Sequence, residues 1–245
     1  MKRYILFIGL LLTFNNLIAQ KKITENTKSN GIKDVYVHLK FAQNIVVKNW
    51  SKNEISVEAT VNLNDNKQND KFSFKTNRIA NTFKIKSDFG NLFKNHKKNI
   101  TITHNGEGCN GYNFCTNHNN VVVNYVIYVP NNMELKIKSI SGSVEADNYV
   151  GNLNLDLISG NITIKKHSKD MYLKTISGDI DIYVKDATLE AKTLTGGIYS
   201  DLDIDFNQHK KRKSYGHQKI RATIKNGTAS LKLNTISGDI FLRKI

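Results

Sequence analysis

The chain has 245 residues, a length that suits one elongated domain or a regular domain with a less regular partner. One proline and two cysteines exclude a proline-rich stalk and a disulfide-dense miniature scaffold. The formal net charge of +15 predicts electrostatic attraction to polyanions.

The first 19 residues are predicted to be an export signal. Lys2 and Arg3 form its charged start, residues 5–12 its apolar core, and Ala19 its cleavage end. The apolar run is short for a membrane span, and no later segment is long and apolar enough to be one. Removal of Lys2 and Arg3 leaves 34 basic and 21 acidic residues, a formal charge of +13. We therefore expect an exported protein that is periplasmic, associated with the outer surface or secreted.

The segment between the signal and the middle of the chain has a changing pattern. Residues 20–33 are polar and without periodicity, which predicts a flexible leader. Residues 34–130 contain short alternating segments, which predict irregular β coils that cap one end of the core. Residues 87–119 interrupt these coils as a long polar loop, and loops of this length are usually functional or mobile.

Residues 131–245 contain a recurring phrase, such as Ile-Ser-Gly-Asp-Ile. Its glycines Gly142, Gly160, Gly178 and Gly196 are eighteen residues apart, and Gly238 follows after forty-two. A strict short period is typical of stacked repeats. Residues 207–217 are predicted to be an inserted loop.

Aligned on the glycines, the repeats give columns of aliphatic residues with period-2 alternation. The alternation shifts between Leu157 and Ile158, and the Ser-Gly that follows suits a corner, because glycine accepts positive φ. The five glycines are therefore predicted to be structural turn residues. The predicted fold is all-β: a parallel β-solenoid, similar to a β-helix, with eighteen-residue repeats that stack in succession around an aliphatic interior.

Two alternatives fit the pattern less well. An antiparallel sandwich would also show short alternating strands, but it would not require the same residue type at the same phase of every unit. A helical repeat would need apolar residues at a spacing of 3.6, whereas the spacing here is 2.

Cys109 and Cys115 lie in the predicted loop 87–119. In an exported protein, a disulfide that pins the loop is the simplest interpretation. His104 and His118 flank the cysteines, so a tetrahedral zinc site is an alternative, as are free thiols. A catalytic cysteine is disfavoured because nothing places a general base beside either residue.

Two basic clusters are candidates for binding polyanions. They comprise Lys94, Lys97 and Lys98 in the first loop, and Lys210, Lys211, Arg212 and Lys213 in the second. The alternative is that these residues are solvated loop tips that keep a β-rich protein soluble.

The outward positions of the predicted strands form ladders. Lys138, Asp156, Lys174 and Lys192 are expected to stack on one face. The segment Asp201-Leu-Asp-Ile-Asp205 could hold calcium, but the nonapeptide of calcium-binding β-rolls is absent, which favours ordinary aspartates facing solvent. No catalytic residue, metal site or cofactor is predicted.

Several segments together resemble the family named "putative bacterial adhesin". They are the Ser-Gly-Asp-Ile phrases, Ile45-Val-Val-Lys-Asn-Trp50, Tyr128-Val-Pro130 and the closing stretch Leu231–Leu242. The resemblance covers about residues 34–245. It implies a secreted, non-enzymatic β-strand-repeat domain of the cell envelope and transfers no catalytic residue.

These features favour an exported adhesin-like scaffold that binds an envelope polysaccharide, a surface glycan or a protein partner. Nucleic acid is not an expected partner, because no recognition module is present. The alternatives are a periplasmic envelope-stress sensor or structural module and, with less support, a glycan-cleaving β-helix enzyme. Self-association through the C-terminal edge is a further expectation.

Overall fold

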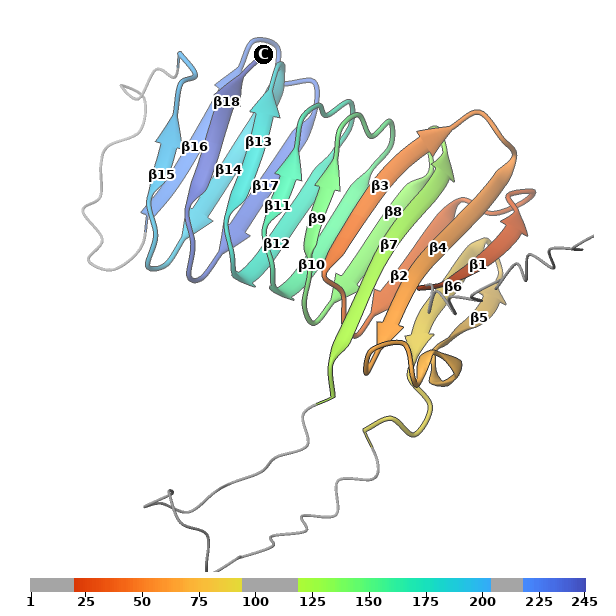
Figure 1. Ribbon diagram of the computed structural model, residues 1–245. Helices are drawn as coiled ribbons and strands as arrows, with labels where there is room; N and C mark the ends of the chain where they lie inside the picture. The colour runs from red at the N-terminus through yellow and green to blue at the C-terminus, as the bar shows by residue number, and fades with distance from the viewer. Residues whose placement is uncertain (1–19, 94–118, 204–217) are drawn as a thin grey trace, which may run out of the picture.

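The computed structural model describes residues 20–93, 119–203 and 218–245 (Figure 1). In these ranges the chain is almost entirely β, with one short 3-10 helix, η1 (Asn69–Lys71). No helix there is long and apolar enough to cross a membrane. The strands are β1 (Lys21–Lys28), β2 (Asp34–Leu39), β3 (Asn44–Trp50), β4 (Glu54–Leu63), β5 (Ser73–Ile79), β6 (Thr82–Asp88), β7 (Val121–Pro130), β8 (Glu134–Ser139), β9 (Ser143–Ala146), β10 (Leu153–Ser159), β11 (Ile162–Ile164), β12 (Met171–Ser177), β13 (Ile180–Val184), β14 (Ala187–Thr193), β15 (Ile198–Ser200), β16 (Gln218–Ile224), β17 (Ser230–Thr235) and β18 (Ile240–Lys244).

The strands form two nine-stranded sheets that face each other as layers (Figure 1). Sheet A has the order β1-β4-β7-β3-β9-β11-β13-β18-β15, and sheet B the order β16-β14-β17-β12-β10-β8-β2-β6-β5. The chain passes from sheet B to sheet A at each Ser-Gly corner, so one strand of each sheet makes one coil. The core is the apolar layer between the sheets.

Like residues stack on like residues in the regular coils. Leu153 pairs with Leu135 on one side and Met171 on the other, and Ile162 pairs with Val144 and Ile180 in the opposite sheet. All are at most 2% exposed. This register confirms the aliphatic interior that the alternation predicted.

The last coil does not lie at the end of the stack. Strands β17 and β18 are inserted between β12–β13 and β14–β15, so Leu231 pairs with both Met171 and Leu189, and Ile240 pairs with both Ile180 and Ile198 (Figure 1). The prediction that units stack in chain order is therefore wrong here. Coils of the same pattern offer equivalent edges, so pattern alone does not set their order.

The end of the stack is made by other strands than predicted. β15 is the edge of sheet A, and β16 pairs antiparallel with β14 to form the edge of sheet B. Among the described strands, the C-terminal strand β18 is interior, because it pairs with β13 on one side and with β15 on the other.

The sheets are mixed rather than wholly parallel, which corrects the parallel solenoid. Antiparallel pairs join β1 to β4, β4 to β7, β5 to β6 and β14 to β16. Residues 21–28, predicted to be a flexible leader, form β1 along the edge of sheet A. Its side chains are mostly polar, so the sequence shows no core pattern; only Ile23 packs against the core.

The corners explain the Ser-Gly-Asp phrase. At Gly178 φ is +150°, and a Cβ atom would overlap the carbonyl oxygen of Gly160 in the neighbouring coil. The residue after the glycine links successive coils: Asp179 Oδ1 accepts the backbone N–H of Asp239, and Asp239 Oδ1 accepts that of Gly197. Gly142, Gly160 and Gly238 also have positive φ, whereas Gly196 is not among the positive-φ residues.

One aliphatic column lies outside the core. Leu157 is buried, but Ile158 is 51% exposed, so the alternation continues through Ile158 and changes only at the Ser-Gly corner. The predicted position of the shift, between Leu157 and Ile158, is therefore wrong. The equivalent residues Ile140, Ile176, Leu194 and Ile236 are also exposed.

Candidate polyanion-binding face

The outward side of sheet B carries two adjacent rows of mostly basic side chains, which we call the basic face. In order across the sheet, the first row is Lys84, Tyr36, Lys136, Asn154, Tyr172, Lys232, Glu190 and Arg221, and the second is Lys86, His38, Lys138, Asp156, Lys174, Asn234, Lys192 and Lys219. These rows contain nine Lys or Arg residues and two carboxylates. The excess of positive charge makes this face a candidate for binding polyanions.

The two carboxylates are each shared between cations. Asp156 lies 3.4 Å from the Nζ atoms of both Lys138 and Lys174. Glu190 lies 2.8 Å from Lys219 Nζ and 2.9 Å from Arg221 Nε, and these partners, Lys219 first, lower the pKa of its carboxyl group. Ion pairs this exposed add little stability. Because these two carboxylates face nine cations, the face remains net positive.

His38 lies between Lys86 and Lys138 in the second row. Partial burial lowers its pKa, and the positive charges of Lys86, Lys138 and Lys40 lower it further. The imidazole is therefore neutral at neutral pH. Burial is the larger cause of this lower pKa, and the positive charges of the face add to it.

A row of aliphatic side chains borders the basic face where the strands of sheet B end. It consists of Ile140, Ile158, Ile176, Ile236 and Leu194, in their order across the sheet, and we call it the aliphatic row. These residues are 38–51% exposed. Each follows a member of the second basic row by two residues, so both point to the same side of the sheet.

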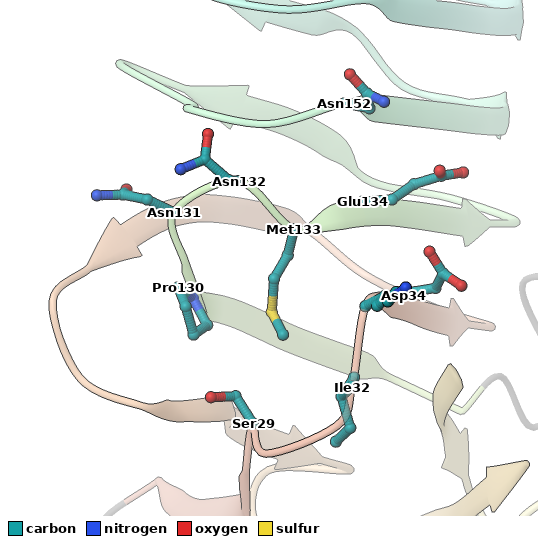
Figure 2. A pocket seen from close by; sticks show the side chains of 10 residues that line it. Ser29, Ile32, Asp34, Pro130, Asn131, Asn132, Met133, Glu134 and Asn152 are labelled. Carbon is teal, nitrogen blue, oxygen red and sulfur yellow. The ribbon is translucent and has the colours of Figure 1, made fainter. Parts of the chain in front are cut away.

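At the opposite ends of these strands, a shallow pocket of about 470 Å³ opens beside β2 and β8. Figure 2 shows the carboxylates of Asp34 and Glu134 at its rim, and Met133 between Pro130 and Ile32. A second pocket of about 260 Å³ shares Glu134 and Asn152 with it. Among the described residues, no group of three or more His, Cys, Asp or Glu side chains could hold a metal ion.

Many of the sequence-predicted site residues fall outside the described ranges. They are Cys109 and Cys115, Lys94, Lys97 and Lys98, and Lys210, Lys211, Arg212 and Lys213. The predicted export signal, residues 1–19, also lies outside.

The predicted ladders are partly reproduced. Lys138, Asp156 and Lys174 lie side by side, but Asn234 separates Lys174 from Lys192 because the last coil is inserted there. Asp201 and Asp203 contact the last strand: the backbone N–H of Lys244 donates to Asp201 Oδ1, and its Nζ lies 2.6 Å from Asp203 Oδ2. Asp205 lies outside the described residues.

Sequence reasoning missed much of the basic face. Four of its basic residues alternate with buried residues along their strands: Lys84, Lys86, Lys136 and Lys232. The signal in the sequence was this period-2 alternation, which places all four on the outward side of the sheet. Attention to clusters of adjacent basic residues favoured the loops instead. Basic residues spaced by one buried position become neighbours only when the strands are paired.

Comparison with known proteins finds one matching family model and several similar solved structures. Residues 130–243 match the Toastrack DUF4097 family model. The Toastrack match begins at the last residue of β7 and includes β8 to β17 and nearly all of β18. It therefore includes most of the basic face and the whole aliphatic row.

Two solved structures extend the comparison to most of the chain. A crystal structure of a "putative cell adhesion protein" from Clostridium sporogenes is 11% identical, covers 92% of this chain and 100% of its own, and has a TM-score of 0.51. One of a "putative adhesin" from Bacteroides fragilis is 10% identical, covers 93% of this chain and 98% of its own, and has a TM-score of 0.34. The first similarity shows a shared fold. A search of curated proteins finds no match.

Proposed function

We propose that this chain is an exported cell-envelope protein that acts as a non-enzymatic, adhesin-like scaffold. Its basic face binds an anionic envelope polysaccharide or surface glycan. The observation that carries the proposal is the excess of lysine and arginine over carboxylates in the two adjacent rows of sheet B.

The shape of the face favours a polymer over a small ligand. The rows cross eight neighbouring strands, from β6 to β16, a distance of about 34 Å at ~4.8 Å per strand. In the second row, Lys138, Lys174 and Lys192 lie on every second strand, at a spacing of about 9.6 Å. A linear polyanion lying along a row would contact several cations at once, and this multivalency would raise its affinity.

Further support comes from the sequence and the comparisons. The first 19 residues have the pattern of an export signal, and the formal charge after their removal is +13. The structurally similar protein from Clostridium sporogenes carries the name of a cell adhesion protein. These features agree with a role at the cell surface.

The test is binding of purified residues 20–245 to a soluble anionic polysaccharide, with a neutral dextran for comparison, at low and high salt. Lys136→Gln, Lys138→Gln and Lys174→Gln combined should weaken binding by roughly tenfold or more, because each lysine near an anionic surface contributes up to about 1 kcal/mol. The salt dependence should decrease with the charges removed.

A matched triple variant controls for net charge. Lys22→Gln and Lys48→Gln in sheet A, with Lys165→Gln directly after β11, remove the same charge and should change affinity by less than about twofold. Equal losses of affinity in the two triple variants would show that binding depends on net charge and not on the basic face. A loss confined to the variant in which Lys210, Lys211, Arg212 and Lys213 are neutralised would move the site to the loop.

Location decides between adhesion and a periplasmic role. Protease added to intact cells should degrade the protein if it is displayed on the surface. Full protection until the outer layer is opened would contradict the adhesin role and favour a periplasmic module.

A further inference from the structure

The aliphatic row is an unusual feature for a surface. Surface aliphatic residues are normally scattered, and contiguous exposed apolar groups mark interaction sites. Here five such residues occupy neighbouring coils, with Ile158 51% and Leu194 47% exposed. At ~4.8 Å per strand, the row is about 19 Å long. A single surface can therefore cover all five side chains.

Small side chains follow the row on its far side. Ser159, Ser177, Ser237 and Thr195 come next in sequence and are exposed. The carboxylates of Asp179 and Asp239 also lie at the corners, where their Oδ1 atoms accept backbone N–H groups of the neighbouring coils. Phe93, 40% exposed, packs on Phe41 near the Ile140 end and adds apolar surface there.

Positive charge flanks the row on its near side. Lys138, Lys174 and Lys192 precede Ile140, Ile176 and Leu194 by two residues, about 7 Å along the strand. A second copy of this chain packed face to face on the row would bring these lysines toward their counterparts, and like charges would oppose it. A soluble polyanion would neutralise the lysines but leave the aliphatic side chains in water.

We infer that this corner of the molecule docks on an anionic lipid bilayer. The inference rests on the proposed function, because it uses the same basic face and names its partner surface. The aliphatic row enters the boundary between headgroups and acyl chains, while the lysines of the second row contact lipid phosphates. Apolar burial and electrostatic attraction are the two contributions that bind a protein to a membrane surface.

The experiment is flotation of residues 20–245 with vesicles of phosphatidylcholine and phosphatidylglycerol, and with vesicles of phosphatidylcholine alone. The wild-type chain should bind only the anionic vesicles. The double variant Ile158→Ser/Ile176→Ser should bind them at least tenfold more weakly. The control Ile79→Ser/Ile245→Ser removes two isoleucines that are 52% and 59% exposed elsewhere and should change binding by less than twofold.

Soluble anionic polysaccharide separates this inference from the proposed function. The row variant should bind the polysaccharide as the wild type does, since its lysines are intact. Wild-type binding to polysaccharide but not to vesicles would overturn only the lipid inference; binding to neither would overturn both. Unchanged vesicle binding by the row variant would show attachment by charge alone, and loss of both ligands would assign the row to the polymer; either overturns the inference.

A tryptophan variant tests the inference by a gain of fluorescence signal and not by a loss of binding. Ile158→Trp should show a blue shift of tryptophan fluorescence on addition of anionic vesicles, and Ile79→Trp should show none beyond the contribution of Trp50. Light scattering of the row variant gives the last check. A change from dimer to monomer would identify a second copy as the occupant and overturn the inference.

Discussion

At Gly178 the neighbouring coil leaves room for no side chain. A Cβ atom would overlap Gly160 O, and φ is +150°, which L side chains rarely adopt. Gly178→Val should therefore lower the free energy of unfolding by about 2–4 kcal/mol, from backbone strain and displacement of the corner. Urea titration measures this loss. Ser177→Ala, at the exposed preceding position, should stay within about 0.5 kcal/mol, and a similar loss there would contradict the corner geometry.

His167 makes stability dependent on pH. It is 7% exposed; Nε2 accepts the backbone N–H of Lys185, and Nδ1 has no partner among the described residues. Burial lowers its pKa, although Asp186 opposes the shift. The unfolded chain then binds more protons as pH falls through about 6.5 and below, so its contribution to stability is present above that pH and lost toward the lower folded pKa.

The measurement is urea unfolding of the wild type and of His167→Gln between pH 7.5 and 5. The wild type should lose stability on acidification, and the variant, which cannot titrate, should lose less. Parallel curves for the two proteins would contradict a titrating His167.

At the scale of the element, buried threonines tie three strands of sheet B, β12, β14 and β17, to the corner of a neighbouring coil. Thr235 Oγ1 donates to Gly178 O at 2.9 Å, and Thr175 and Thr193 make the equivalent bonds to Gly160 O and Gly238 O. Leu157 occupies this position in β10, so an apolar side chain fits there. Thr235→Val should therefore cost only the hydrogen bond, about 1–2 kcal/mol.

Thermal melting of Thr235→Val tests this bond, and Thr163→Val, at an outward position of β11, is the matched control. The buried variant should melt at a lower temperature and the control close to the wild type. Equal melting temperatures would show that the hydroxyl group contributes nothing.

The strands also show which features of the fold could be predicted from the sequence. Alternation predicts that Leu153, Leu155 and Leu157 all face inward, because a buried strand face needs a period of 2. It does not predict the exposure of Ile158, since an aliphatic residue beside a corner fits either side. It also does not rank the partners of Leu231, because each coil offers the same column of aliphatic residues. The basic face depends on those partners, so its lysines become one surface only in three dimensions.

At the scale of the whole molecule, the order of coils makes a counterintuitive prediction about length. Within the ranges that the structure describes, β14 pairs only with β16 and β17, and β15 only with β18. A chain that stops after Ala229 lacks β17 and β18, so β14, β15 and β16 lose their connection to the stack while remaining attached to the chain. Their unpaired edges promote aggregation.

A shorter truncated chain should therefore unfold more cooperatively and aggregate less than a longer one. Residues 20–186 end after β13 and keep every coil up to that point in contact with its neighbours, and repeat stacks tolerate loss of terminal units. Circular dichroism melting and size-exclusion chromatography compare the two truncations. We expect residues 20–186 to melt more cooperatively and aggregate less than residues 20–229. If coils stacked in chain order, the longer chain would retain one more complete coil and be the more stable, and that result would contradict the insertion of β17 and β18.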